Sequence, residues 1–294
     1  MARESSTGST LAVLPRRPVR FERRHGSAVV VKSYLVAEGA AIFAAMTDLW
    51  ASPLGRARRG GPGMPEPLGF DARTGALTTA WVPGTPLGDR GRTAAAHSRS
   101  VEVGNLLAHL HGSGVVVDQV RDRPSLARSV RRGAADLAAD PSTPGAVLEA
   151  FAEASLAVDR AWLHDQATPR QVLGHGALAP HSLLVNARGL VILDFDRLEM
   201  AEIERDLAHW AAWLWVTDGA RGAAPNTVAL LGDLVSGYAA TSRRVPADRA
   251  ALEVHLAVAL IHVAHSWTSL RHDPLTRLRV VNAATALAQR HPAG

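Results

Sequence analysis

The hydrophobic pattern divides the chain into an N-terminal part with short strands and a longer helical part. In the N-terminal part, short runs of apolar and β-branched residues are typical of strands, and they lie at 28–36, 68–70 and 77–82. A helical period covers 37–50, and the Gly- and Pro-rich stretch 52–67 that follows predicts a loop. We therefore expect residues 19–88 to form a small β-rich lobe.

From residue 89 onward the pattern is mainly helical. Helical periods predict helices at 93–112, 125–139, 144–164 and throughout the chain after 200. Short strand-like runs interrupt them at 172–173, 183–185 and 190–193, and a tight-turn sequence at 186–189 joins the last two. We expect residues 89–294 to form a helical C-terminal lobe, and residues 1–18, rich in Ser, Pro and Arg, to form a flexible basic arm.

Composition narrows the class of protein. The chain has no cysteine, which excludes disulfides, thiolate catalysis and Cys-ligated zinc. No run of eighteen uncharged apolar residues occurs, and the N-terminus lacks the apolar segment of a signal peptide, so we expect a soluble, cytoplasmic protein without a membrane partner.

The excess of basic residues lies in the first 75 positions, without interleaved aromatic residues or a nucleic-acid motif. We therefore interpret it as a solvated basic face and expect no nucleic-acid partner.

Lys32 is the only lysine among the 32 basic side chains of the chain. Arginine serves wherever any positive charge is enough, but a site that needs a compact ammonium on a flexible stem requires lysine. Lys32 is therefore a candidate functional residue, with an ordinary surface lysine as the alternative.

Segments with polar groups occur in a fixed order along the chain. Val29–Lys32 is a strand that ends in the lysine, the segment 175–182 (HGALAPHS) precedes a strand, and the segment 191–196 (VILDFD) ends the next strand. Two further segments, 81–87 (WVPGTPL) and 205–208 (RDLA), accompany them. Each segment by itself is only weakly specific for any one protein family, whereas the whole set in this order is much more specific.

In this order the segments resemble the aminoglycoside phosphotransferase and choline-kinase-like family, whose signature is His-Gly-Asp-Leu-His-Pro-x-Asn followed by Ile-Asp-Phe-Asp. The resemblance extends from about residue 20 to about residue 290. It implies an α+β, bilobal protein-kinase-like fold with a small β-rich N-lobe and a larger, mainly helical C-lobe. It also implies ATP, or another nucleoside triphosphate, together with Mg²⁺.

The resemblance further implies roles for individual residues. Lys32 would contact the nucleotide phosphates, Asp194 would bind Mg²⁺, and Asp196 would assist the metal or order its loop. Ala80 and Val82 would lie at the hinge between the lobes, where contacts to the nucleotide are mainly made by the backbone. The alternative for the two aspartates is a turn pair after a strand.

The helix partner of Lys32 stays open at this point. Glu38 is close to it in sequence, and Asp48 is a shorter side chain at a more usual sequence distance. No glycine-rich phosphate loop precedes the lysine; a lone glycine, Gly26, lies just before the expected strand.

The loop that begins at His175 departs from the family signature. Ala177 occupies the position of the catalytic aspartate, Ala179 that of the second histidine, and Ser182 that of the metal-binding asparagine. A methyl group neither accepts a proton nor binds a metal, whereas the Ser182 hydroxyl is still a weak metal ligand. His175 is retained, and His181 is a candidate substitute base.

Other polar residues are given structural interpretations. We expect Asp206 to order the loop that holds His175. The histidines at 255, 262 and 265 fall near one face of a helix; they resemble a metal cluster or the lining of an acceptor pocket, but without a nearby carboxylate we interpret them as half-buried helix residues.

These departures favour a pseudokinase, or a strongly impaired kinase, that binds Mg-nucleotide and acts with a partner enzyme, peptide or ligand. The first alternative is an active phosphotransferase on a small-molecule or peptide hydroxyl, for instance in a natural-product pathway, because losing the base costs about 10²–10⁴-fold in rate without abolishing turnover. The second is a binding protein that uses the cleft between the lobes for a ligand other than ATP.

Overall fold

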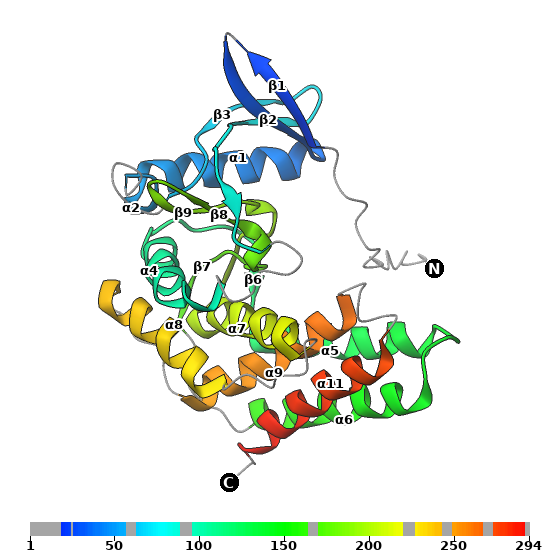
Figure 1. Ribbon diagram of the computed structural model, residues 1–294. Coiled ribbons are helices and arrows are strands. Elements are labelled where there is room, and N and C mark those ends of the chain that lie inside the picture. Colours follow the sequence, from blue (N-terminus) through cyan, green and yellow to red (C-terminus); the bar gives the residue numbers. More distant parts are fainter. Residues whose placement is uncertain are drawn as a thin grey trace, which may run out of the picture.

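The computed structural model has a small sheet-containing lobe above a larger helical part (Figure 1). It describes residues 19–24, 26–56, 63–88, 96–163, 170–219, 227–242, 249–266 and 273–291. The basic arm expected at 1–18 lies outside the described residues, as does the segment 89–95 at the expected boundary between the lobes. The order of elements, an antiparallel sheet followed by mainly helical structure, confirms the fold class expected from the sequence.

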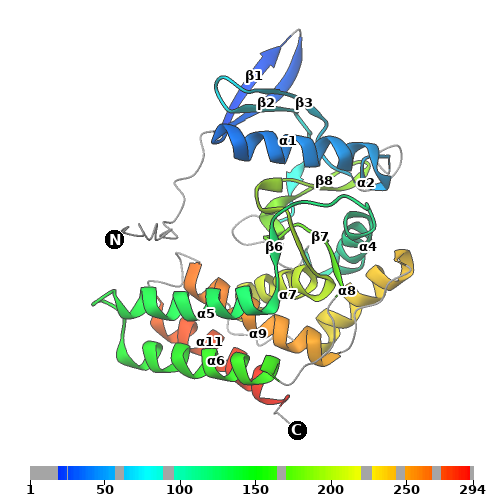
Figure 2. The same ribbon diagram turned by 180° about the vertical axis from the view of Figure 1, so that it is seen from behind.

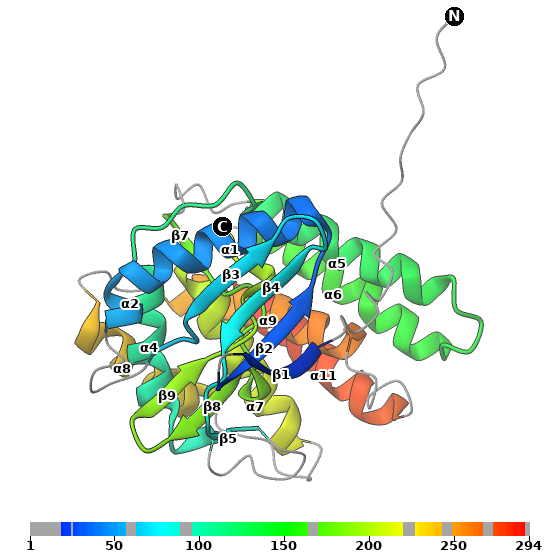
Figure 3. The same cartoon turned by 90° about the horizontal axis from the view of Figure 1, so that it is seen from above.

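The N-terminal lobe is a four-stranded antiparallel sheet in the order β1-β2-β4-β3. Its strands are β1 (Val19–Arg24), β2 (Ser27–Ser33), β3 (Pro67–Asp71) and β4 (Ala76–Ala80). Helix α1 (Val36–Ala51) packs against β3 and β4, and Figure 3 shows it running along the sheet. The alternation of β2 buries Val29 and Val31, which leaves Lys32 on the opposite face of the strand.

Two small sheets lie between this lobe and the helices. One contains β5 (Thr85–Pro86), β8 (Leu183–Asn186) and β9 (Gly189–Ile192), and the other contains β6 (Val120–Arg121), β10 (Glu199–Glu202) and β7 (Gln171–Gly174). The hairpin expected from the turn at 186–189 is therefore confirmed. The expectation of helix directly after residue 200 is wrong, because β10 extends to Glu202 and pairs with both β6 and β7.

The helices of the larger part begin and end as follows: α4 (Ser100–His111), α5 (Arg123–Ala138), α6 (Gly145–Leu163), α7 (Ile203–Gly219), α8 (Thr227–Thr241), α9 (Arg249–Ser266) and α11 (Pro274–Gln289). Figure 2 shows α5, α6, α9 and α11 packed together at the end farthest from the N-terminal sheet. The short helix α2 (Pro53–Arg56) lies in the stretch that was expected to be a loop. None of the helices in the described ranges is long and apolar enough to cross a bilayer.

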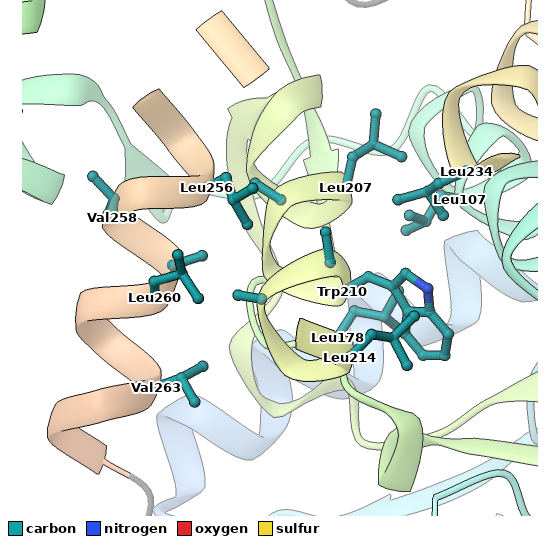
Figure 4. Packing of buried hydrophobic residues seen from close by; sticks show 14 of the residues in the cluster. Leu107, Leu178, Leu207, Trp210, Leu214, Leu234, Leu256, Val258, Leu260 and Val263 are labelled. Atoms are coloured by element: carbon teal, nitrogen blue, oxygen red, sulfur yellow. The ribbon is translucent and has the colours of Figure 1, made fainter. Parts of the chain in front are cut away.

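Helix α7 forms the centre of the core. Leu207, Trp210 and Leu214 are fully buried, because α8 and α9 pack against α7 from two directions (Figure 4). A helix that is apolar over most of its circumference is expected to be enclosed in this way. The side chains on α7 that stay partly exposed therefore mark the part of its surface that other helices do not cover.

Glycines allow α4 and α8 to cross in close contact. A Cβ on Gly104 of α4 would overlap the backbone of Leu234 and Tyr238 in α8. We expect Gly104→Ala to lower the free energy of unfolding by about 1–3 kcal/mol, because the helices must move apart. Gly232→Ala on α8 is the matched control, since nothing lies within 4 Å of the position that its methyl group would take, and this change should be neutral or slightly stabilising. Urea denaturation of both variants checks the prediction, and equal stability of the two would contradict it.

Candidate functional site

A cavity of about 260 Å³ lies between the N-terminal sheet and the segment after β9. Residues that the sequence singled out share its lining: Lys32, Ala80, Val82, Asp194 and Asp196. Aromatic side chains that the sequence analysis did not select also line it: Phe21, Tyr34, Trp81 and Phe195. The structure therefore brings together groups that are as far apart in the sequence as residues 32 and 194.

The ammonium of Lys32 lies between two carboxylates that also line this cavity. Its Nζ donates to Asp194 Oδ1 at 2.5 Å and also to Asp196, and the Tyr34 hydroxyl donates to the other oxygen of Asp196. Burial alone would raise the pKa of Asp194, but the charge and hydrogen bond of Lys32 outweigh it and hold that pKa below its usual value. The Asp194 side chain is 49% exposed, so its carboxylate can still meet a ligand.

Asp194 has a left-handed backbone, with φ 64° and ψ 57°. Among the described residues it is the only non-glycine residue with a positive φ, a conformation that costs free energy and clusters at functional sites. Neighbouring contacts hold it in place: Leu193 N donates to Ser182 O at 2.8 Å, and His175 Nε2 donates to Leu193 O at 2.8 Å. The loop at 175–182 and the end of β9 are thus fixed to each other.

The carboxylate of Asp206, in the first turn of α7, organises that loop. It accepts from the backbone N–H of His175 at 2.6 Å and of Gly176 at 3.0 Å, and it bonds to His111 Nε2 at 3.1 Å. The Tyr238 hydroxyl lies on the other side of the same imidazole, 3.2 Å from His111 Nδ1. Burial would raise the pKa of Asp206, but the hydrogen bond and charge of His111 hold it far below its usual range. The expectation that Asp206 orders the loop is confirmed.

The scaffold of the loop is intact around Ala177. Gly176 has a φ of 76°, and a Cβ there would overlap the carbonyl oxygen of Arg197, so glycine is required. Leu178 is fully buried in the core beside Trp210 (Figure 4), whereas Ala177 is half-buried. Ser182 is buried as well, and its carbonyl makes the bond to Leu193 described above.

The ion pairs of Lys32 do not involve the carboxylates of α1 that the sequence suggested. Within the described residues its partners are Asp194 and Asp196. Glu38 lies half-buried in the first turn of α1, and Asp48 is exposed near the end of this helix. The role of Glu38 in the site stays a prediction.

The other histidines that the sequence singled out have separate surroundings. The His181 ring meets Trp213 edge-on at 5.3 Å, and burial lowers its pKa, against the opposing charge of Asp194. His255 Nε2 lies 3.2 Å from Glu202 Oε2. The expectation that no carboxylate is near the α9 histidines is therefore wrong, because Glu202 is distant from them in the sequence but close in the fold. Within the described ranges no group of three or more His, Asp or Glu side chains is arranged to hold a metal ion.

The chain belongs to the phosphotransferase enzyme family, whose family model matches residues 32–253. This range contains both the Lys32 strand and the loop with Ala177. A comparison with curated protein sequences finds no significant match.

Solved structures confirm the fold. A choline/ethanolamine kinase family protein from Mesorhizobium loti is 15% identical with a TM-score of 0.60, covering 93% of this chain and 87% of that chain. The choline kinase LicA of Streptococcus pneumoniae in complex with AMP is 12% identical with a TM-score of 0.59, covering 93% and 88%. A spectinomycin phosphotransferase in complex with ADP and spectinomycin is 14% identical with a TM-score of 0.53, covering 92% and 88%. The fold is therefore that of the choline and aminoglycoside kinases.

The Asp206 contacts lead to a prediction about stability. We expect Asp206→Asn to lower the free energy of unfolding by about 3 kcal/mol at pH 7, since an amide cannot accept from all three donors. The folded-state pKa is depressed, so the carboxylate stabilises the fold above its unfolded pKa of about 4, and this stabilisation is lost as the pH falls further. The difference between wild type and variant should therefore shrink from pH 5 to pH 3.

Chemical denaturation across this pH range measures the effect. Asp159→Asn is the control, because Asp159 forms a surface pair with Arg131 that is worth at most about 1 kcal/mol. A difference between wild type and Asp206→Asn that does not change with pH would contradict the assignment.

Proposed function

We propose that the protein binds a nucleoside triphosphate with Mg²⁺ in the cavity between its lobes and transfers the terminal phosphate to a hydroxyl of a small molecule. One observation carries the proposal: the only lysine of the chain lies between two carboxylates in the lining of a mostly apolar cavity. An ammonium beside two acidic groups is the donor set that a metal–phosphate complex requires.

The residues present fit such a ligand. Lys32 supplies a compact positive charge for phosphate oxygens, and Asp194 and Asp196 supply hard oxygen ligands for Mg²⁺. In the absence of phosphate these groups neutralise one another, which is the observed ion pair. Ser182 is the proposed further metal ligand, since its backbone is fixed beside Leu193, the residue before Asp194.

The apolar part of the cavity lining suits a flat, mostly apolar base. Val30, Leu77 and Leu184 contribute to it together with aromatic rings from β1 and the hinge. The backbone N–H groups of Ala80 and Trp81 are occupied by Glu66 O and Ala28 O. That of Val82 has no hydrogen-bond partner among the described residues, so we assign it the hinge contact to the base.

The chemistry follows from charge and position. Bound Mg²⁺ would neutralise charge that develops on the phosphate oxygens. Lys32 holds the phosphates from the N-terminal lobe, while the left-handed backbone of Asp194 fixes its carboxylate from the other lobe. Positioning of this kind supplies most of the rate enhancement in phosphoryl transfer.

The similar structures support a small-molecule acceptor. LicA is a choline kinase that binds AMP, and the spectinomycin phosphotransferase binds ADP together with an antibiotic. We carry over to this chain only the class of reaction, nucleotide-dependent transfer to a small hydroxyl compound.

A pseudokinase is the second candidate, and Ala177 is the observation that favours it. On this account the protein binds Mg-nucleotide and acts by holding a partner enzyme or peptide, for instance in a natural-product pathway. The two candidates share the nucleotide site and differ in turnover.

Nucleotide binding depends on Lys32 in both candidates. We expect titration calorimetry to show binding of Mg-ADP to the wild type and at least about a tenfold weaker affinity for Lys32→Met, which corresponds to about 1.4 kcal/mol. Lys32→Arg is the charge-matched comparison, and we expect it to bind weakly because its planar fork does not replace a compact ammonium. Equal affinity of the wild type and Lys32→Met would remove Lys32 from the site.

Turnover separates the two candidates. We expect the wild type to release ADP from Mg-ATP faster than Lys32→Met and Asp194→Asn, with choline, ethanolamine or spectinomycin as acceptor probes and with water alone. The reason is that both variants lose charge that holds the phosphates or the metal. Release by the wild type that is no faster than by the two variants would favour the pseudokinase.

A further inference from the structure

One face of α7 lies along the loop that contains Ala177 and contacts it. Arg205, His209 and Trp213 are spaced four residues apart, so they form one stripe along the helix. Each is only half-buried, although most of α7 is enclosed. Their partners in the loop are, in order, Gly176, Leu178 and His181.

Two of these contacts flank the position of the missing carboxylate. Arg205 Nη2 donates to the carbonyl of Gly176 at 3.3 Å, and His209 Nδ1 lies 2.7 Å from the carbonyl of Leu178. Ala177 lies between the two carbonyl groups in the chain. An imidazole is therefore hydrogen-bonded to the backbone one residue after the position that replaces the aspartate.

The hydrogen bond of His209 determines its tautomer. A carbonyl oxygen only accepts, so Nδ1 carries the proton and Nε2 carries a lone pair. Nε2 makes no hydrogen bond with the described part of the chain, and the residue is not fully enclosed. Burial lowers the pKa of His209 to about 4, so the ring is neutral at pH 7 and about as basic as an aspartate.

The other histidines of the loop are less suited to accept a proton from a ligand. His175 uses Nε2 to donate to Leu193, and its Nδ1 is buried without access to solvent. His181 meets Trp213 through a ring contact and makes no hydrogen bond that fixes its tautomer among the described residues. His209 combines a fixed orientation with an uncommitted nitrogen.

We propose that His209 is the general base of the reaction, in place of the carboxylate absent at Ala177, and that Nε2 accepts the proton of the acceptor hydroxyl. This proposal rests on the proposed function. The acceptor oxygen bonds to the terminal phosphorus of the nucleoside triphosphate, and the bond from that phosphorus to its bridging oxygen breaks. The nucleoside diphosphate leaves with the electron pair, and the proton passes to Nε2.

The decisive variant is His209→Asn. The Asn side-chain N–H₂ takes the place of Nδ1–H and keeps the bond to Leu178 O, but nothing basic replaces Nε2. We expect kcat for ADP release from Mg-ATP to fall by about 10²-fold or more, the usual contribution of a general base, with an unchanged affinity for Mg-ADP. The probes are water alone and added choline, ethanolamine or spectinomycin. His109→Asn, at a half-buried histidine of α4 outside the site, should keep the wild-type kcat.

Two further variants test whether His209 is the general base, even if His209→Asn is poorly folded. His209→Ala should regain activity when imidazole is added to the buffer, which a purely structural side chain does not explain. Ala177→Asp in the His209→Asn background should restore turnover, because it returns a carboxylate to the loop after the imidazole has been removed.

The outcomes distinguish this proposal from the function on which it rests. If the wild type releases ADP faster than Lys32→Met but His209→Asn retains wild-type kcat, His209 is not the base and the phosphotransferase proposal stands. The same conclusion follows if His181→Asn, rather than His209→Asn, loses the activity. If the wild type is no faster than Lys32→Met, both proposals are overturned.

Discussion

The buried carboxylate of Asp206 is the interaction on which the candidate site depends. It joins the start of α7 to the backbone of His175 and Gly176 and, through His111, to α4 and Tyr238 of α8. A buried charge needs such compensation, and here two backbone N–H groups and an imidazole bond to it. The loop that follows β7 is consequently rigid, and the positions of Ala177 and Ser182 are fixed even though their side chains differ from the family signature.

Much of the fold and part of the site follow from the sequence alone. The strand that contains Lys32 and the hairpin before Asp194 could be predicted because apolar runs and turn residues are local signals. The ordered motifs then placed Lys32, Asp194 and Asp196 in one site, and the structure brings these three together. Strand β10 could not be predicted in this way, because it is stabilised by pairing with β6 and β7, which come from distant parts of the chain.

The features missed by sequence reasoning are contacts between distant segments. Tyr34 follows Lys32 by two residues, so its position near the lysine could have been noticed in the sequence. Its hydrogen bond to Asp196, however, depends on how the two lobes meet. His209 had no signal, because only the packing of α7 against the loop reveals that its ring reaches Leu178. Ala177 alone suggests a lost activity, whereas an imidazole bonded to the carbonyl of the next residue, Leu178, is consistent with a base supplied from another element. The balance between pseudokinase and enzyme thus depends on a contact that is invisible in the linear motif.

The central claim is that the ion pair of Lys32 marks a working Mg-nucleotide site. The most direct test is a crystal structure of the full chain with Mg²⁺ and a non-hydrolysable ATP analogue. We predict that Lys32 moves from Asp194 and Asp196 to the phosphates, that Asp194 binds the metal with its left-handed backbone unchanged, and that the base contacts the N–H of Val82. An analogue bound outside this cavity, or a Lys32 still paired with both carboxylates while the analogue is bound, would contradict the account.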